Sequence, residues 1–440
     1  MLENINKELL SFLKDSPTCF HAVAEIKKQL DEAGFTQLDE TTQWNLTKNG
    51  KYYTIRNGSS IIAFHIGKDM DNYHFQLTAA HSDSPTYKVK ENAELAGQGG
   101  YLQLNTEGYG GMLAASWFDR PLSLAGRIVV KEGNTIQSKL LKIDRDILVI
   151  PNVAIHLNRD ANNGIKYNNQ VDLLPLFSAG ELQAGDYYKF LAAELGVKRE
   201  DILGSDMFLY NRDNSIEWGV KDEFISSPRL DNLQCSFASL KGFMNAENTK
   251  SIAVYACFDN EEVGSSTKQG AGSTFLYDVL QRINLSLGYE NKDYYSAIAK
   301  SFMLSCDNAH AVHPNHPELT DKKNCAYLNK GIVIKYNANQ RYTTDAISNA
   351  VFTDLCNHFK IPYQHFANRS DMVGGSSLGN ISSTKVSMNA VDLGLPQLAM
   401  HSAYETAGSK DTAYLVEAIK HFFESDIRID DVSKIEVNYK

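Results

Sequence analysis

The sequence has few of the features that mark secreted or membrane-spanning proteins. Only six of its 440 residues are cysteines, and they are scattered without CxxC spacing. We therefore expect reduced, buried thiols rather than a disulfide framework. No apolar run reaches the length of a membrane span, and the N-terminus lacks the basic and apolar regions of a signal peptide. These absences predict a soluble, cytoplasmic protein without a membrane partner.

Positive charge is also in short supply. The 43 Lys and Arg residues stand against 53 Asp and Glu, which gives a net charge of −10. Since no basic stripe is available to neutralise phosphates, we expect no nucleic-acid partner. Internal repeats and low-complexity tracts are absent. The chain is nevertheless long enough for a large core and more than one domain.

The central feature of the sequence is an apolar run that ends in carboxylates. Residues 252–258 are apolar and rich in strand-forming side chains, and the polar sequence DNEE follows at 259–262. Three other apolar runs end in residue types that bind metals, at His81, Asp307 and His401. Ligands of open α/β sheets bind at the carboxyl ends of the strands. These side chains are therefore expected to converge at one edge of a sheet.

We interpret this convergence as a metal centre. The expected ligands are two imidazoles and three carboxylates, namely His81, Asp231, Glu262, Asp307 and His401. Each alone could be a solvated loop residue or a structural histidine, but the ordered set favours metal binding. The set suits two divalent ions about 3.5 Å apart with one bridging carboxylate, and such ligands accept zinc, cobalt or manganese.

Two further carboxylates have expected roles beside the ligands. Because adjacent side chains point apart, Glu261 would address a bound water while Glu262 binds metal. Asp83 lies two residues beyond His81 and would orient that imidazole. A free carboxylate beside two metal ions indicates hydrolysis, with hydroxide as the attacking group.

The middle of the chain differs in character from the rest. Residues 88–227 contain glycine-rich turns and much Asn in the loops, and no His or carboxylate stands at a clear strand end. We interpret them as a β-rich domain inserted into a discontinuous catalytic domain of residues 1–87 and 228–440. The expected fold class is α/β, with a mixed central sheet flanked by helices.

Local patterns predict individual elements on this plan. Within the insertion they indicate a hairpin over 127–143, a strand over 147–157 and a helix over 186–195. Elsewhere they indicate two strands and five helices: strands over 52–56 and 60–65, and helices over 19–33, 231–245, 273–285, 344–359 and 412–424.

The order of the metal-binding motifs resembles that of the co-catalytic zinc aminopeptidases. Short sequence motifs are similar to those of the aspartyl aminopeptidase and aminopeptidase I family. They are TAAHSDSP (78–85), SPRLDNL (227–233), DNEEVGS (259–265), SCDNAHAVHPN (305–315) and MHS (400–402). The resemblance covers essentially the whole chain. It implies a zinc-peptidase type of sheet, an inserted dimerisation domain and removal of the N-terminal residue from short peptides.

The resemblance also implies roles for particular residues. It assigns the metals to the same five ligands, with Asp231 bridging and Glu261 as the general base. It adds substrate contacts from His310, Lys335 and Tyr342, and it matches His156 to a histidine that reaches a neighbouring subunit's site. The family assembles dimers into a hollow tetrahedral dodecamer, so a homo-oligomer with restricted access is expected.

Substrate preference stays open at this stage. The charge of Lys335 favours an acidic N-terminal residue, Asp or Glu. Two stretches differ from the better-known acidic-specific members: HSAYET at 401–406, where many relatives read HSIRE, and VGG at 373–375. The alternatives are a neutral or basic preference, or a self-assembling shell protein with a structural metal site. The presence of Glu261 favours an enzyme over a shell.

Overall fold

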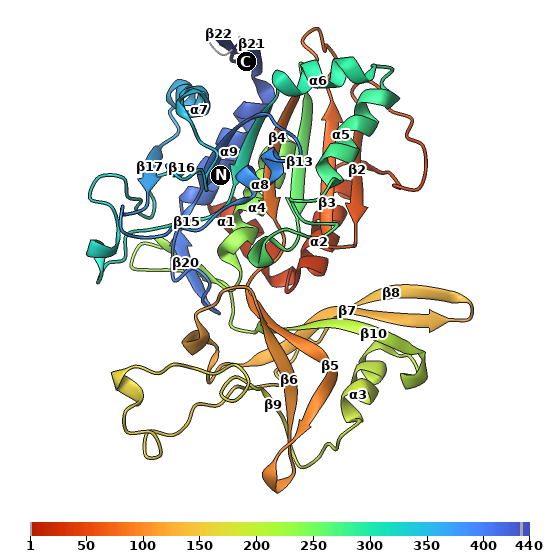
Figure 1. Ribbon diagram of the computed structural model, residues 1–440, viewed down its shortest axis with the longest axis vertical. Coiled ribbons are helices and arrows are strands. Elements are labelled where there is room, and N and C mark those ends of the chain that lie inside the picture. Colours follow the sequence, from red (N-terminus) through yellow and green to blue (C-terminus); the bar gives the residue numbers. More distant parts are fainter. Residues whose placement is uncertain (1, 432–433) are drawn as a thin grey trace.

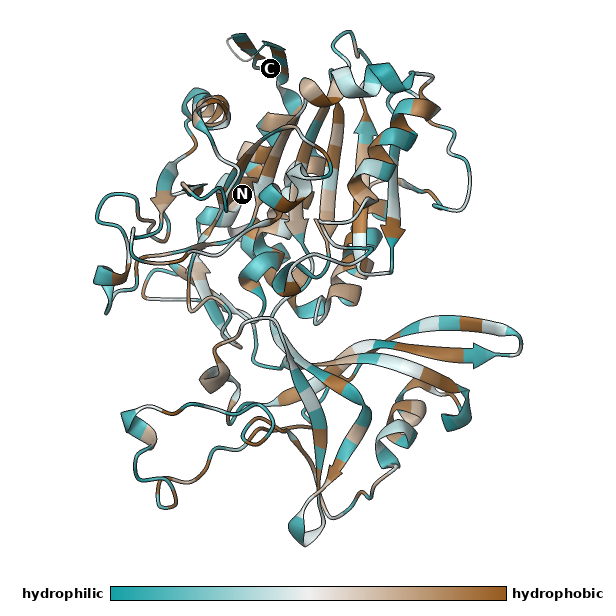
Figure 2. Cartoon of the chain, in the orientation of Figure 1, coloured by the Kyte–Doolittle hydropathy of each residue, from teal (hydrophilic) through white to brown (hydrophobic). Residues whose placement is uncertain are grey.

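The computed structural model describes residues 2–431 and 434–440 and shows two parts joined at a narrow waist (Figure 1). The upper part is an α/β layered structure that contains both ends of the chain. The lower part is built mainly from strands. Hydrophobic residues gather in the strands of the upper sheet, and hydrophilic residues mark the outer helices and loops (Figure 2).

The upper part is organised around a mixed nine-stranded sheet, as the sequence predicted. Its middle strands β13, β4, β14 and β18 run parallel, so their carboxyl ends share one edge. In sheet order the strands are β1 (Thr36–Gln37), β2 (Lys51–Arg56), β3 (Ser60–Ile66), β13 (Ile252–Phe258), β4 (Phe75–His81), β14 (Phe302–Cys306), β18 (Asn389–Gly394), β16 (Ile332–Tyr336) and β17 (Tyr363–Ala367).

Helices cover both faces of this sheet, which explains why β13 is apolar at every position. Alternate side chains of β13 enter two separate cores, Tyr255 on one face and Val254 on the other. The Tyr255 face is covered by α1 (Leu2–Asp15), α2 (Cys19–Glu32), α4 (Leu230–Asn245), α7 (Ala346–Phe359) and α9 (Asp411–Glu424). The Val254 face is covered by α5 (Phe275–Ser286), α6 (Asn291–Ala299) and α8 (Leu378–Ser383).

The lower part is a six-stranded antiparallel sheet with a core of its own. In sheet order its strands are β8 (Thr135–Lys142), β7 (Leu122–Glu132), β10 (Ile202–Asn211), β5 (Thr86–Ala96), β6 (Tyr101–Tyr109) and β9 (Leu176–Ala179). The helix α3 (Asp186–Leu195) packs on it through Tyr187 and Leu191. The hairpin and the helix that the sequence predicted here are confirmed.

A smaller sheet lies where the chain returns to the upper part. Its strands are β11 (Ile216–Trp218), β12 (Phe224–Ser227), β20 (Glu405–Gly408), β19 (Pro396–Leu398) and β15 (Ala309–His310). Strands β11 and β12 fall within the range 88–227, yet β12 pairs with β20 from the C-terminal region. A final hairpin, β21 (Asp426–Asp431) and β22 (Lys434–Asn438), follows α9.

One predicted element is wrong. Residues 147–157 do not form a strand; Leu148, Val149 and Ile150 make only isolated bridges, and a turn follows. Pro151 has no N–H to continue a ladder, and the apolar side chains of Val153 and Leu157 face solvent instead of a core. The segment is therefore divided: Leu148 and Ile150 are buried in the core of the lower part, and the apolar residues after Pro151 are exposed. The helices and strands predicted outside the insertion are confirmed, with ends that agree within two residues.

The cysteines agree with the expectation of free thiols. All six are free, and only Cys325 is not buried. None of the helices within residues 2–431 and 434–440 combines the length and the apolar character that crossing a membrane requires.

Candidate metal centre

The expected ligands lie together at the carboxyl edge of the central sheet. His81 is the last residue of β4 and pairs in register with Phe258, the last residue of β13. Glu262 follows β13 in a short 3-10 helix, and Asp307 follows β14 directly. Strand register therefore brings these side chains to one place.

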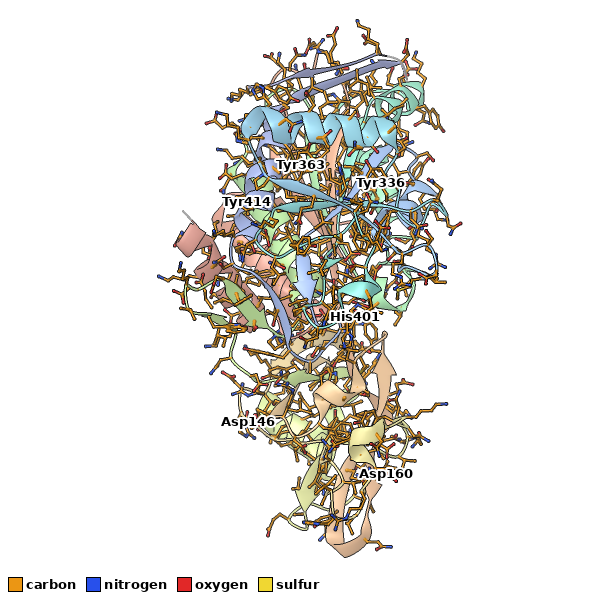
Figure 3. The ribbon with its side chains drawn as sticks, turned by 90° about the vertical axis from the view of Figure 1, so that its left-hand side faces the viewer. Asp146, Asp160, Tyr336, Tyr363, His401 and Tyr414 are labelled. Carbon is orange, nitrogen blue, oxygen red and sulfur yellow. The ribbon has the colours of Figure 1, made fainter. Side chains whose placement is uncertain are left out.

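The other two ligands come from irregular segments beside this edge. Asp231 lies in the first turn of α4, where its backbone is not yet helical, with φ −79° and ψ 113°. His401 lies between β19 and β20 and has a φ of 65°. Its side chain lies near the junction of the two parts of the molecule (Figure 3).

Asp231 lies between the two histidines. His81 Nε2 is 3.8 Å from Asp231 Oδ1, and His401 Nε2 is 3.2 Å from Asp231 Oδ2. Each histidine also has its own carboxylate: Asp307 Oδ1 is 3.5 Å from His81 Nε2, and Glu262 Oε1 is 3.5 Å from His401 Nε2. The five side chains therefore form two halves that share Asp231.

The donor set fits a divalent cation. Among the described residues, Asp231 Oδ1 and Glu262 Oε1 are buried carboxylate oxygens without a hydrogen-bond donor. Buried charge without a partner is costly, and a cation would supply that partner. His81, Asp231 and Glu262 also each offer one ligand atom within 4.8 Å of the others. Imidazole nitrogen and carboxylate oxygen are common ligands of zinc.

The pKa values of these groups also indicate an excess of buried negative charge at the site. Burial, with the neighbouring charge of Asp231, raises the pKa of Glu262 well above its usual range. Burial opposes protonation of His401, but its hydrogen bond to Asp231 and the charges of the surrounding carboxylates together raise its pKa to about 10. Without a cation, the protein thus retains protons at this site.

Glu261 lies beside the ligands and, among the described residues, makes no ion pair with a lysine or an arginine. Its Oε2 is 4.0 Å from His81 Nε2, and its side chain is 14% exposed. Burial raises the pKa of Glu261 to about 8; His81 works against the rise, and the nearby carboxylates add to it. The arrangement suits a group that exchanges a proton with a reacting molecule.

Asp83 contacts His81, Glu261 and Glu262 and thereby links them. His81 Nδ1 lies 3.0 Å from the backbone oxygen of Asp83 and 3.3 Å from its Oδ1. The Asp83 carboxylate also accepts the N–H groups of Glu261 and Glu262, each at 3.2 Å. The Tyr109 hydroxyl, from the lower sheet, donates to Asp83 Oδ2 at 2.7 Å. Asp83 can therefore orient both the imidazole and the two glutamates.

Lys335 is buried, and its ammonium group contacts Asp307. Its Nζ donates to the backbone oxygen of Asp307 at 2.8 Å and lies 3.4 Å from Asp307 Oδ2. It also donates to the backbone oxygen of Asn308 at 3.3 Å, and the Tyr342 ring centroid is 5.0 Å away. Although burial opposes it, Asp307 raises the pKa of Lys335. The ammonium thus already holds one of the candidate ligands.

The other two expected substrate contacts are exposed. His310 ends β15, three residues beyond Asp307. His156 lies in the long loop between β8 and β9. That loop also carries Asp160, which lies well away from His401 in Figure 3. Among the described residues, no hydrogen bond or ion pair joins His156 to a candidate ligand.

Sequence reasoning missed two side chains that touch the site. Tyr109 comes from the lower sheet, and nothing in its local sequence relates it to Asp83. Glu405 is buried and accepts hydrogen bonds from the backbone N–H groups of Asp231 and His401. No local pattern marks Glu405 either, because it begins the short mixed strand ETAG at 405–408.

Comparisons with known proteins agree with a zinc-binding hydrolytic site. A family model described as aminopeptidase I zinc metalloprotease (M18) matches residues 12–423. A curated relative, the probable M18 family aminopeptidase 2 of Clostridium acetobutylicum, is 46% identical to this chain. That match covers 95% of this chain and 98% of the relative.

Solved structures share the fold over nearly the whole chain. A chain from the complex of Ape4 and Nbr1 superimposes with a TM-score of 0.92 at 36% identity, covering 96% of this chain and 86% of that one. The mApe1 dodecamer of S. cerevisiae gives a TM-score of 0.84 at 27% identity, with coverage of 96% and 97%. The inserted sheet is therefore part of a shared architecture.

We expect zinc to stabilise the folded protein. The buried carboxylates repel one another only in the folded state, so a bound cation should raise the melting temperature of chelator-stripped protein. At free zinc of 100 times Kd, the stabilisation would be about 2.7 kcal/mol. Scanning fluorimetry with added Zn²⁺ measures the shift, which Asp231→Asn should strongly reduce. A melting temperature that zinc leaves unchanged would contradict the metal-centre interpretation.

Proposed function

This chain belongs to the aminopeptidase I (M18) family of zinc metalloproteases, and on that premise we propose that it acts through two divalent ions held around Asp231. The main observation behind the proposal is that the two oxygens of the Asp231 carboxylate face different histidines. One oxygen faces His81, the other faces His401, and each histidine has a separate acidic partner. A carboxylate shared in this way suits the bridging position of a two-metal hydrolase.

The proposed ligand sets follow from these distances. His81 and Asp307 would hold one ion, His401 and Glu262 would hold the other, and Asp231 would serve both. Zinc is the family's metal; cobalt and manganese accept the same ligand types.

The proposed reaction is hydrolysis of the first peptide bond of a short peptide. When bound, zinc lowers the pKa of a water molecule and polarises a peptide carbonyl. Glu261 Oε2 takes a proton from the attacking water and delivers it to the nitrogen of the leaving peptide. Asp83 keeps Glu261 in place through the backbone N–H and keeps His81 Nε2 directed at the site. The products are a free amino acid and a peptide shortened by one residue.

The lower sheet is proposed to mediate assembly. Its long loop exposes apolar side chains that a partner subunit would cover: Val153 is 57%, Leu157 83% and Val171 68% exposed. S. cerevisiae mApe1 forms a dodecamer, and we propose the same assembly here, with His156 reaching a neighbouring subunit's site. We place the start of this inserted domain near residue 88 and its end before β11, since β12 pairs with β20. A cytoplasmic location is proposed on the strength of the free thiols.

The proposed preference is for acidic N-terminal residues. Lys335 carries the positive charge nearest to Asp307, with Tyr342 beside it and His310 exposed nearby. One observation favours a second candidate, a neutral preference: the Lys335 ammonium already has three acceptors. The shell-protein alternative is set aside because the family is one of aminopeptidases.

A peptide panel tests the substrate preference. Peptides that differ only in an N-terminal Asp, Glu, Leu, Lys or Ala would be assayed with protein reloaded with zinc, cobalt or manganese. We expect kcat/KM to be about 10- to 100-fold higher for Asp and Glu, the range for one charge-assisted hydrogen bond. A higher kcat/KM for the Leu or Ala peptide than for the Asp and Glu peptides would support the neutral preference. No cleavage of any peptide would contradict the proposed function.

Glu261→Gln tests the proposed base. Turnover should fall by about 10²- to 10⁴-fold because the amide cannot accept the proton, while the content of bound metal stays unchanged. Glu32→Gln, at the exposed end of α2, is the matched control and should leave both quantities unaltered. If Glu261→Gln retained most of the wild-type turnover, the assignment of the base would be wrong.

A further inference from the structure

Glu405 is a buried carboxylate behind the metal centre that the proposed reaction does not use. It is 1% exposed and begins β20, where it pairs in register with Ser227 of β12. Its two oxygens face different segments of the chain. Oε2 accepts the backbone N–H of Asp231 at 2.9 Å, and Oε1 accepts the backbone N–H of His401 at 2.7 Å.

These two amides belong to the residues whose side chains meet at the shared carboxylate. His401 Nε2 and Asp231 Oδ2 are 3.2 Å apart. Asp231 and His401 are far apart in sequence: Glu405 lies four positions after His401 but 174 positions after Asp231. A single side chain therefore ties together the backbones that carry both groups.

The backbone at both positions needs such support. His401 has a φ of 65°, in the left-handed region that is unfavourable for a residue with a Cβ. Asp231 has φ −79° and ψ 113° and so lies outside the regular helix of α4. Buried N–H groups outside regular structure need an acceptor. Glu405 supplies that acceptor at both places.

Glu405 is not arranged as a metal ligand itself. Both of its oxygens are occupied by amides, whereas Asp231 and Glu262 each have a buried oxygen without a donor among the described residues. Hydrogen bonds from amides to a carboxylate are about twice as strong as those to a neutral acceptor. When ionised, Glu405 therefore holds the two backbones more firmly than a neutral acceptor would.

We propose that Glu405 is a positioning residue that sets the separation of Asp231 and His401 and thereby the metal affinity of the His401 half of the site. The proposal rests on the proposed function, since it assumes that these two residues bind metal. Loss of either hydrogen bond would let the two side chains move apart, and the site would hold its cation less tightly.

Glu405→Gln is the variant that tests this role. Glutamine offers one acceptor oxygen and one NH₂ group, so it can keep only one of the two backbone contacts. We expect its affinity for Zn²⁺, measured by competition with a chelator, to fall about 10- to 100-fold. Saturating Zn²⁺ should restore most of the kcat, which it cannot do for Glu261→Gln.

Asp411→Asn is the matched control. Asp411 is also fully buried, and its carboxylate accepts the backbone N–H groups of Gly331 at 3.0 Å and Asn329 at 2.7 Å. Neither of these hydrogen bonds involves a candidate metal ligand. We expect Asp411→Asn to lower the melting temperature but to keep the wild-type affinity for Zn²⁺.

The outcomes separate this proposal from the proposed function. Wild-type affinity for Zn²⁺ in Glu405→Gln, or an equal loss of affinity in both variants, would overturn the positioning role. A wild-type protein that binds no Zn²⁺, or whose binding does not depend on Asp231, would instead overturn the proposed function. A selective loss in Glu405→Gln with recovery at high Zn²⁺ supports the role of Glu405.

Discussion

The structure depends on one electrostatic constraint: several carboxylates are buried at the same edge of a sheet. Asp231 and Glu262 each keep a buried oxygen without a donor among the described residues, and Glu261 retains a raised pKa beside them. Such a group of like charges is unfavourable in a protein interior unless cations enter it. Two histidines and Lys335 offset part of the charge. Bound metal ions would therefore compensate the negative charge that these groups leave.

The lower sheet contributes directly to this site as well as to the proposed assembly. The chain that follows β6 passes along the metal centre. The Leu113 N–H donates to the backbone oxygen of His401 at 2.9 Å, and the Ala403 N–H donates to Ser116 Oγ at 2.8 Å. Tyr109 anchors Asp83 a few residues earlier. The segment 109–116 therefore contacts the residues that hold both His81 and His401.

The sequence predicted the parts of the site that follow from strand periodicity. His81, Glu262 and Asp307 stand at the ends of buried strands, and their convergence follows from the parallel order of β4, β13 and β14. Asp231 and His401 lie in irregular backbone. The short apolar run before His401 still indicated that residue, whereas no strand end marks Asp231. Tyr109 and Glu405 act through contacts across the fold that leave no local pattern. The strand expected over 147–157 failed because only its first residues are buried and bridged, whereas the apolar residues after Pro151 face solvent, and periodicity alone does not distinguish the two.

The central claim is that Asp231 is shared by two metal ions. The most direct test is anomalous diffraction at the zinc edge from crystals grown with Zn²⁺. The account predicts two peaks about 3.5 Å apart, one near His81 and Asp307 and the other near His401 and Glu262. A single peak at full occupancy, or peaks that leave Asp231 without a metal contact, would contradict it.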